Sequence, residues 1–293
     1  MKTMKTDHQI PGMIDKVMID KEGDINSFIR FSGKFHRTGI ERYGKTYKQH
    51  SHTVLVSTFF NIIDRLNATT SLEIGAFQAE FSRKFISNAT SGHALAVEAN
   101  PHNYKKFKSA LTEAGVNYHH AAVLDREGPC ELQLHVTDLD IENGYIRGNN
   151  SILKSDARPD TQAVSVPGTT LDALVKSYVE SGSIPDPKDT HPVLWIDVEG
   201  ALDLVITGGT QTIANSTVIF AEVETECLWN NQATFIEVAA QLDKLGFSPW
   251  LRDCEYEPEQ FNVMFANRKL VEADMLASLA AQFYDELQPG TGT

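Results

Sequence analysis

The stretch SLEIGAF, residues 71–77, places an apolar strand directly before a glycine. A strand that ends in glycine is typical of the first βα unit of a nucleotide-binding fold, where a ligand approaches the glycine backbone. A dinucleotide loop follows the pattern G-x-G-x-x-G, but the sequence GAFQAE, residues 75–80, keeps only Gly75. Glu73 and Glu80 add negative charge, which disfavours a phosphate at this turn. The stretch therefore predicts a strand–turn–helix unit whose ligand has a positively charged end.

Apolar strands and helical patterns alternate around this unit. Further strands are predicted at 94–99, 116–124, 192–200, 217–224, 247–253 and 261–267, and helices at 53–66, 79–89, 101–115, 169–181, 201–209 and 234–246. This rhythm predicts an α/β fold with a parallel sheet and right-handed crossovers. Residues 125–168 interrupt it with strand-like segments around a loop rich in glycine and asparagine, at 142–151.

These patterns divide the chain into three parts. Residues 1–60 are polar and irregular before they become more apolar, and we interpret them as a helical N-terminal extension and a candidate acceptor lid. Residues 61–269 form the α/β domain. Residues 270–293 are predicted to be an amphipathic helix followed by a frayed tail.

Composition limits the classes of partner. The chain has 293 residues and a formal net charge of -13, which repels nucleic acid and anionic membranes at long range. Residues 30–52 differ, because they hold six Lys/Arg, three His and a single acid, Glu41. This stretch could meet an anionic substrate or could be an ordinary solvated face. Three scattered cysteines, no secretory signal and no long apolar run predict a soluble, cytoplasmic protein.

A second carboxylate indicates the nature of the ligand. Glu98 ends the strand at 94–99, 23 residues after Gly75, near the spacing at which an acid accepts hydrogen bonds from ribose hydroxyls. A nucleoside with a positively charged, phosphate-free arm fits both observations, and S-adenosylmethionine is such a molecule. Glu73 could equally be a structural acid that caps the turn.

More carboxylates follow the two later strands. Asp197 and Glu199 lie two residues apart in WIDVEG (195–200), as do Glu222 and Glu224 in FAEVET (220–225), so each pair shares one side of an extended strand. One use is general-base catalysis on an acceptor hydroxyl, for which the candidates are Asp197, Glu199 and Glu224. Another is a divalent ion such as Mg²⁺, held by Asp197, Glu222 and Glu224. Asp197 could instead be only a helix N-cap.

The motifs resemble those of FkbM-type methyltransferases. LEIGAFQAEFS, AVEANPHNYKKF, AAVLDREG, GNNSIL, VPGTTLDALV, WIDVEGALDLVITGG and IFAEVE occur in the family's order over roughly residues 70–225. The resemblance implies a Rossmann-like, seven-stranded, mostly parallel sheet of the class I methyltransferases. It also implies S-adenosylmethionine as cofactor, and O-methylation of a hydroxyl on a sugar, glycan, polyketide or similar natural product.

The resemblance also implies site residues by position. The first cofactor loop is Glu73, Gly75, Ala76 and Phe77; the ribose side is Glu98, Ala99 and Asn100; Ala122 and Val123 border the adenine; Asp197 faces the methyl group; and Asn150 and Ser151 lie on the rim that meets the substrate. The family usually has Asn and Gly where this chain has Phe77 and Ala79, and Lys where it has Trp195. Residues 1–60 fall outside the resemblance and are candidates for acceptor choice.

Two other functions compete with this one. An RNA ribose 2′-O-methyltransferase would use the basic stretch at 30–52, against the unfavourable net charge. A nucleoside-binding module without turnover, or a nicotinamide enzyme, would need only part of the site, and the missing glycines disfavour the nicotinamide. We expect a small-molecule or glycan acceptor, no nucleic acid and no membrane partner, and leave the oligomeric state open.

Overall fold

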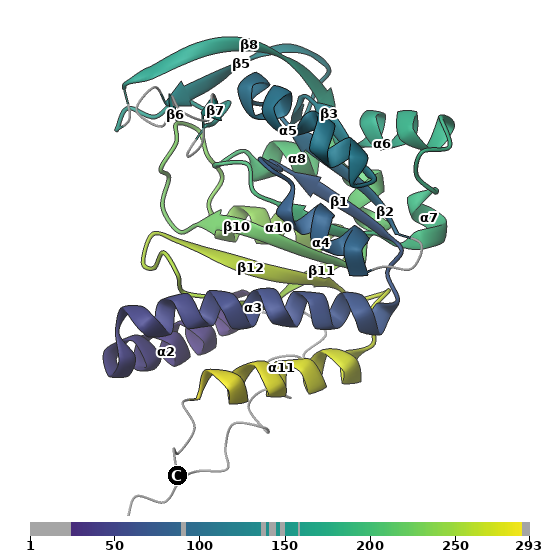
Figure 1. The fold of residues 1–293 in the computed structure, drawn as a ribbon. Coiled ribbons are helices and arrows are strands. Elements are labelled where there is room, and N and C mark those ends of the chain that lie inside the picture. The colour runs from purple at the N-terminus through teal and green to yellow at the C-terminus, as the bar shows by residue number, and fades with distance from the viewer. Residues whose placement is uncertain are drawn as a thin grey trace, which may run out of the picture.

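A computed structural model describes residues 25–88, 92–135, 139–140, 145–146, 150–157 and 159–288. Its centre is a seven-stranded sheet (Figure 1). In sheet order the strands are β11 (Phe247–Arg252), β12 (Gln260–Asn267), β10 (Val218–Glu224), β9 (Val193–Ile196), β1 (Thr70–Ile74), β2 (His93–Glu98) and β3 (Val116–His120). β12 runs antiparallel to both of its neighbours, and the remaining pairs are parallel. The predicted seven-stranded, mostly parallel sheet is confirmed.

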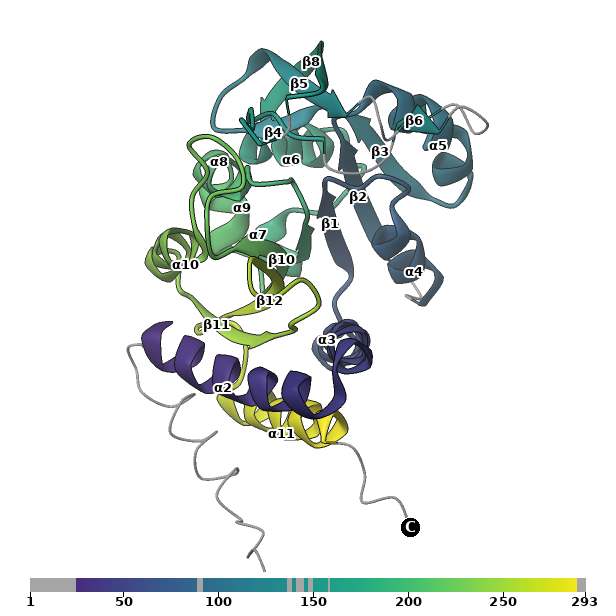
Figure 2. The ribbon, with the colours of Figure 1, turned by 90° about the vertical axis from the view of Figure 1, so that its left-hand side faces the viewer.

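Helices cover both faces of this sheet (Figure 2). One face carries α3 (Lys45–Leu66), α4 (Glu80–Asn88) and α5 (Pro101–Glu113), with α11 (Ala273–Leu287) packed outside α3. The other face carries α6 (Leu171–Glu180), α8 (Leu202–Gly208), α9 (Thr210–Ala214) and α10 (Phe235–Lys244). A short helix, α7 (Pro187–Thr190), precedes β9, and α2 (Ile25–Tyr43) contacts α3 and β11. No helix among the described residues is long and apolar enough to cross a membrane.

Aromatic packing joins α3 to the centre of the sheet. The rings of Trp195 and Phe220, on neighbouring strands, stack with centroids 3.9 Å apart, and Phe59 of α3 packs against both. Trp195 stands where the family pattern has lysine. In this chain an aromatic ring packed under α3 therefore takes the place of a cation.

A smaller sheet interrupts the α/β order. It consists of β4 (Ala122–Leu124), β8 (Thr161–Thr170) and β5 (Gly128–His135), in that order, and a separate pair is formed by β6 (Leu139–Asp140) and β7 (Tyr145–Ile146). The strand predicted at 116–124 is wrong as a single element. Its first half is β3 of the main sheet, whereas Ala122–Leu124 pairs with Gly168–Thr170 of β8. Most of the predicted loop at 142–151 lies outside the described residues.

The N-terminal extension, interpreted from the sequence as helical, consists of helices from Ile25 onward in the described residues. The predicted helix at 53–66 begins at Lys45, and α2 precedes it. The buried positions of α2 are Phe28, Ser32, His36 and Gly39, which are mostly small or polar. Partly buried Ile25, Ile29, Phe31, Phe35 and Ile40 pack beside them against the two cores, so α2 does have an apolar face, although it is not among the helices predicted from the sequence.

Candidate active site

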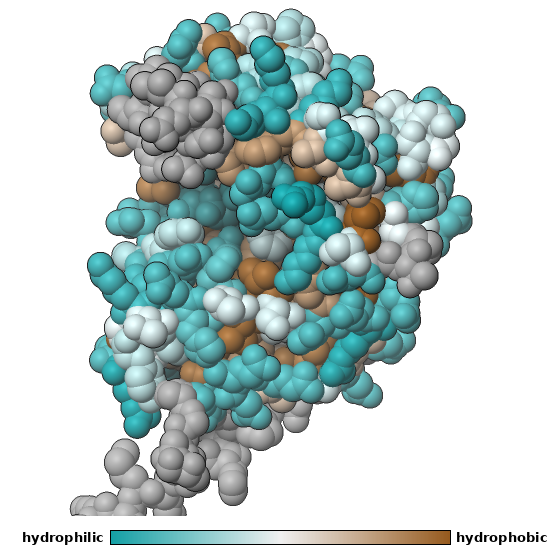
Figure 3. Space-filling model, in the orientation of Figure 1, coloured by the Kyte–Doolittle hydropathy of each residue, from teal (hydrophilic) through white to brown (hydrophobic). Residues whose placement is uncertain are grey.

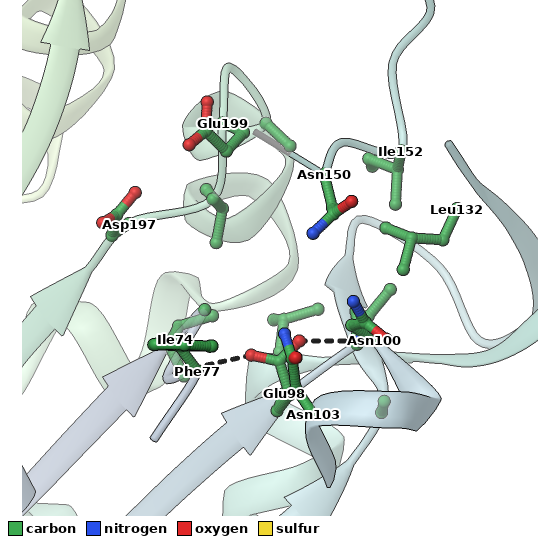
Figure 4. A pocket seen from close by; sticks show the side chains of 17 residues that line it. Ile74, Phe77, Glu98, Asn100, Asn103, Leu132, Asn150, Ile152, Asp197 and Glu199 are labelled. Carbon is green, nitrogen blue, oxygen red and sulfur yellow. Dashed lines mark hydrogen bonds between the residues drawn. The ribbon is translucent and has the colours of Figure 1, made fainter. Parts of the chain in front are cut away.

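A cavity of ≈ 330 Å³ opens at the carboxyl ends of β1, β2 and β9, where ligands bind in doubly wound sheets (Figure 4). In Figure 3 this face of the molecule is hollowed at mid-height. The cavity is lined by Ile74, Gly75, Phe77, Glu98, Ala99, Asn100, Asn103, Ala121, Ala122, Val123, Leu132, Asn150, Ile152, Asp197, Val198, Glu199 and Ala201.

The turn after β1 brings two backbone segments into close contact. Gly75 has φ +78°, and a Cβ atom there would lie 1.7 Å from the carbonyl oxygen of Asp197. The N–H of Asp197 donates to the carbonyl of Ile74 over 2.9 Å, which joins the ends of β1 and β9. Phe77 and Ala79 also have positive φ values, 46° and 51°. These are the positions where the family has Asn and Gly, residues that adopt this conformation at lower cost.

Glu98 is held at the edge of the cavity by backbone groups. Its two carboxylate oxygens accept hydrogen bonds from the N–H of Phe77 over 2.6 Å and of Asn100 over 2.7 Å. Asn103 adds a side-chain hydrogen bond, yet burial dominates and raises the pKa of Glu98 to about 7. The Oδ1 atom of Asn103 is buried and has no hydrogen-bond partner among the described residues. A carboxylate with spare lone pairs and a free amide oxygen therefore lie side by side at this end.

Glu73 and Ala76 do not line the cavity. The carboxylate of Glu73 accepts a hydrogen bond from the N–H of Ser82 over 2.8 Å, in the first turn of α4. Its neighbours in β1, Leu72 and Ile74, point to the opposite face because side chains alternate along a strand. Of the two interpretations of Glu73, the geometry matches the structural acid.

Three acids gather at the other end of the cavity. Ligand atoms of Asp197, Glu199 and Glu222 lie within 4.8 Å of one another among the described residues. Asp197 is exposed to solvent, yet desolvation of its carboxyl by the surrounding protein raises the pKa of Asp197 to about 6, and a hydrogen bond with Glu222 opposes that shift. Burial, and then the charge of Asp197, hold the pKa of Glu222 well above its ordinary value. Two carboxyl groups this close share a proton rather than both ionising.

Glu224 is separate from this group. It is buried, accepts a hydrogen bond from the side chain of Gln260 over 3.4 Å, and does not line the cavity. The predicted metal ligands are Asp197, Glu222 and Glu224. The structure instead brings Asp197, Glu199 and Glu222 together. Glu222 and Glu224 lie on the same face of β10. Glu199 reaches the cluster from the turn after β9, where its φ is +48°.

The two predicted rim residues have different positions. Asn150 lines the cavity. Ser151 is buried; its hydroxyl donates to the carbonyl of Glu199 over 2.6 Å and accepts from the N–H of Leu153 over 3.0 Å. Ser151 therefore supports the backbone of the Glu199 turn.

Several lining residues are absent from the sequence-based predictions. Asn103 lies five residues after Glu98, in the first turn of α5. Its place in the helix that follows the second strand could have predicted it as a cavity residue. Leu132 and Ile152 come from β5 and the segment after β7, and no motif marks them. They are brought to the cavity only by the pairing of β5 with β8 and by the bridge between Gln133 and Ser151.

Comparisons with solved structures give distant matches. The precorrin-6y C5,15-methyltransferase of Geobacter metallireducens is 13% identical, with 68% of this chain and 78% of that chain covered and a TM-score of 0.35. The magnesium protoporphyrin IX methyltransferase of Synechocystis with bound SAM is 7% identical, with 87% and 90% covered and a TM-score of 0.41. A putative tRNA (m1A22) methyltransferase of Streptococcus pneumoniae is 9% identical, with 78% of each chain covered and a TM-score of 0.38. Likeness at this level says nothing about the acceptor of this chain.

Comparison of the sequence with protein-family models identifies the family of this chain. No curated protein matches the chain. The Methyltransferase FkbM domain matches residues 73–249, which is more than half of the chain and includes the first glycine turn, Glu98, Asp197 and the acids of β10. The chain therefore belongs to the FkbM methyltransferase family and is a methyltransferase dependent on S-adenosylmethionine.

Proposed function

We propose that this protein transfers the methyl group of S-adenosylmethionine to a hydroxyl of a sugar, glycan or other natural product. The observation that carries the proposal is the arrangement of the cavity, with Glu98 at one end and Asp197 and Glu199 at the other. A nucleoside with a positively charged arm needs hydroxyl acceptors at one end and negative charge at the other, and this cavity offers both.

The residues present fit the cofactor. Glu98 accepts hydrogen bonds from the ribose hydroxyls, and the buried, unpartnered Oδ1 of Asn103 offers a second acceptor beside it. Apolar side chains of Ala122, Val123 and Leu132 enclose the adenine. Asp197 and Glu199 balance the charge of the amino and sulfonium groups.

The chain's own contribution to the reaction is placement and proton transfer. When bound, S-adenosylmethionine supplies an electrophilic methyl group. Asp197 would take the proton of the acceptor hydroxyl as the hydroxyl oxygen receives that methyl group. The products are a methyl ether and S-adenosylhomocysteine. With a pKa of about 6, Asp197 is largely a carboxylate at neutral pH and can act as this base.

The proposal includes no divalent ion. Asp197 and Glu222 hydrogen-bond each other, so a proton between them neutralises part of the charge that would attract a metal. We expect methyl transfer to survive dialysis against EDTA. Loss of activity with EDTA and its return with Mg²⁺ would instead make Asp197, Glu199 and Glu222 a metal site.

We also infer a cytoplasmic location from the three cysteines. Cys130, Cys227 and Cys254 are all free thiols, as is usual for proteins of a reducing compartment.

Calorimetry with S-adenosylhomocysteine tests the cofactor site. Glu98→Ala should bind it about 10- to 100-fold more weakly, because ribose hydroxyls lose a charged acceptor. Glu113→Ala, at the far end of α5, serves as the matched control. NAD should not bind. Equal affinity of the Glu98 variant and the control, or tight NAD binding, contradicts the proposal.

Asp197→Asn tests the base. The variant should keep its affinity for S-adenosylhomocysteine within a few-fold and lose methyl transfer by about 100-fold or more, as removal of a general base does. Transfer of labelled methyl groups to a panel of methyl glycosides and polyketide alcohols is the measurement. Full activity of the variant removes Asp197 from this role.

A further inference from the structure

A polar network extends from the acidic end of the cavity across the sheet. Glu222 of β10 is directly paired with Asn262 of β12. The backbone and side-chain amides of Asn262 donate to the two carboxylate oxygens of Asp253 over 2.9 and 2.8 Å. Asp253 is fully buried and lies 2.9 Å from Nδ1 of His52, on α3. Strand pairing and these hydrogen bonds together connect Glu222 to His52, on a helix that precedes the family-matched segment.

The hydrogen bond to Asp253 fixes the tautomer of His52. A carboxylate can only accept, so the proton of the neutral ring lies on Nδ1 and its Nε2 is an acceptor. The carboxylate of Glu255 is 3.2 Å from the same Nδ1. The ring packs edge-on against Phe220, and about a third of the side chain, 32%, stays exposed. His52 therefore offers an oriented hydrogen-bonding group to solvent beside the acids.

The loop from Asp253 to Glu259, between β11 and β12, is anchored on both sides. The N–H of Cys254 donates to the hydroxyl of Ser51 over 3.1 Å, and Lys48 donates to the carbonyl of Glu257 over 2.6 Å. The N–H of Thr225 donates to the carbonyl of Glu259 over 2.9 Å. Three of the residues that hold or face this loop, Lys48, Ser51 and His52, belong to one stretch of α3.

Tyr256 is presented at the tip of this loop. The side chain is 51% exposed, which is unusual for an aromatic residue in a loop fixed so firmly. Burial, and then the charges of Glu255, Glu222, Asp253 and Asp197, raise the pKa of its hydroxyl to about 12. Tyr256 directly follows Glu255, whose carboxylate contacts His52, so it extends from the loop next to that contact.

We infer that His52, Glu255 and Tyr256 form the acceptor-binding subsite, and that it takes a hydroxylated acceptor with no anionic group. An apolar C–H face of the acceptor packs on the Tyr256 ring, while His52 and Glu255 hydrogen-bond its hydroxyls. None of the three residues lies in the segment matched by the family, 73–249. The inference rests on the proposed function, because it assigns the second substrate of the same reaction.

The charge of the subsite excludes anions. Asp253 and Glu255 lie 2.9 and 3.2 Å from Nδ1 of His52, and Asp197 and Glu222 belong to the cluster of acids at the end of the cavity. Of the neighbouring cations, Arg252 pairs with the carboxylate of Glu257, and the ammonium of Lys48 is held at the Glu257 carbonyl. The hydrogen bond to Asp253 raises the pKa of His52, and a charge on its ring faces the carboxylates of Asp253 and Glu255. A phosphate or carboxylate on the acceptor would therefore meet like charges at short range, which disfavours its binding.

Saturation-transfer NMR in the presence of saturating S-adenosylhomocysteine tests the subsite without turnover. The probes are neutral methyl pyranosides and the uronates of the same sugars. We expect saturation transfer to the neutral sugars and none to the uronates. Tyr256→Ala should weaken the neutral sugars about tenfold, and Tyr256→Phe, which keeps the ring, should bind like the parent protein.

Each outcome decides one question. Failure of the parent protein to bind S-adenosylhomocysteine removes the proposed function itself. Normal S-adenosylhomocysteine binding with no sugar signal, equal signals from uronates, or unchanged binding in Tyr256→Ala overturns the subsite alone. His52→Gln should also weaken the sugars while S-adenosylhomocysteine affinity stays unchanged; an equal loss of both would make His52 a merely structural residue.

Discussion

The carboxyl group of Glu73 lies wholly inside the protein, between β1 and the first turn of α4. Burial raises its pKa to about 7 even though the N–H of Ser82 donates to it. The ordinary pKa of a glutamate is 4.5, so between pH 4.5 and about pH 7 Glu73 keeps its proton in the folded protein and has lost it in the unfolded chain. The associated stability is complete below pH 4.5 and is lost as the pH rises through 7.

Glu73→Gln should remove this dependence on pH. From pH 4.5 to pH 8 the parent should lose up to about 3 kcal/mol of unfolding free energy relative to the variant. This value follows because each unit of pKa shift corresponds to about 1.4 kcal/mol. Urea denaturation at a series of pH values measures it. Glu80→Gln, on the exposed side of the same turn, is the control. A difference that is independent of pH contradicts the assignment of Glu73 as a buried, protonatable acid.

Glu98 also has a raised pKa, but it lines the cavity, so its protonation should affect cofactor binding. Its pKa of about 7 means that the carboxylate that we propose accepts hydrogen bonds from the ribose hydroxyls is partly protonated at neutral pH. Affinity for S-adenosylhomocysteine should therefore fall as the pH is lowered from 8 to 6, approaching about tenfold per pH unit at the acid end. Calorimetry on Glu98→Gln should show a flatter profile, and identical pH profiles for the two proteins exclude Glu98 as the titrating group.

The two glutamates also show what the sequence can predict at single residues. Glu98 is predictable as a cavity residue because the end of a second strand and its distance from Gly75 define that position in a doubly wound sheet. Glu73 is not, because the strand pattern says which side chains share a face, and not which face meets the ligand. Only the packing of α4 against β1 decides between its two interpretations.

At the scale of elements, the turn after β1 depends on one glycine. Gly75→Ala would introduce a methyl group at the Asp197 carbonyl and also an alanine at φ +78°. We expect a loss of about 3 kcal/mol or more of stability and loss of S-adenosylhomocysteine binding, because the ends of β1 and β9 must separate.

Gly182→Ala separates the two causes. Gly182 has φ +72°, and nothing lies within 4 Å of the place that a Cβ atom would take there. Its substitution should cost only the conformational penalty, about 1 kcal/mol, and leave cofactor binding unchanged. Thermal unfolding and calorimetry compare the two variants. Equal effects would mean that backbone conformation, and not contact with Asp197, makes Gly75 necessary.

Strand prediction succeeds where burial is uniform and fails where a chain changes sheets. β1, β9 and β10 are buried along nearly their whole lengths, and all three are predicted from the sequence. Residues 116–124 are equally strand-like throughout, yet the N–H of Ala121 turns back to the carbonyl of Glu98 and the chain enters the small sheet. Propensity does not encode that change of partner, and for the same reason it cannot predict Leu132 as a lining residue.

At the scale of the whole molecule, charge separates the proposed function from RNA methylation. The basic stretch at 30–52 is the sequence feature in favour of RNA. In the structure, Lys48 donates to Glu257, the guanidinium of Arg42 lies over Tyr43, and Arg30, Lys34 and Arg37 line a different cavity, between α2 and α10. These cations therefore do not form a track that leads to Asp197.

Fluorescence anisotropy with a labelled single-stranded RNA is the corresponding measurement. RNA binding by phosphate contacts releases counterions, so a true substrate would bind at about 50 mM salt and weaken steeply by about 200 mM. With a net charge of -13 and the acids Asp197, Glu199 and Glu222 gathered at one end of the cavity, we expect no binding at either salt concentration. Lys34→Glu combined with Arg37→Glu should leave that result unchanged. Salt-dependent binding that this double variant abolishes would show that the cations of α2 recruit a polyanion, and would make RNA a candidate acceptor again.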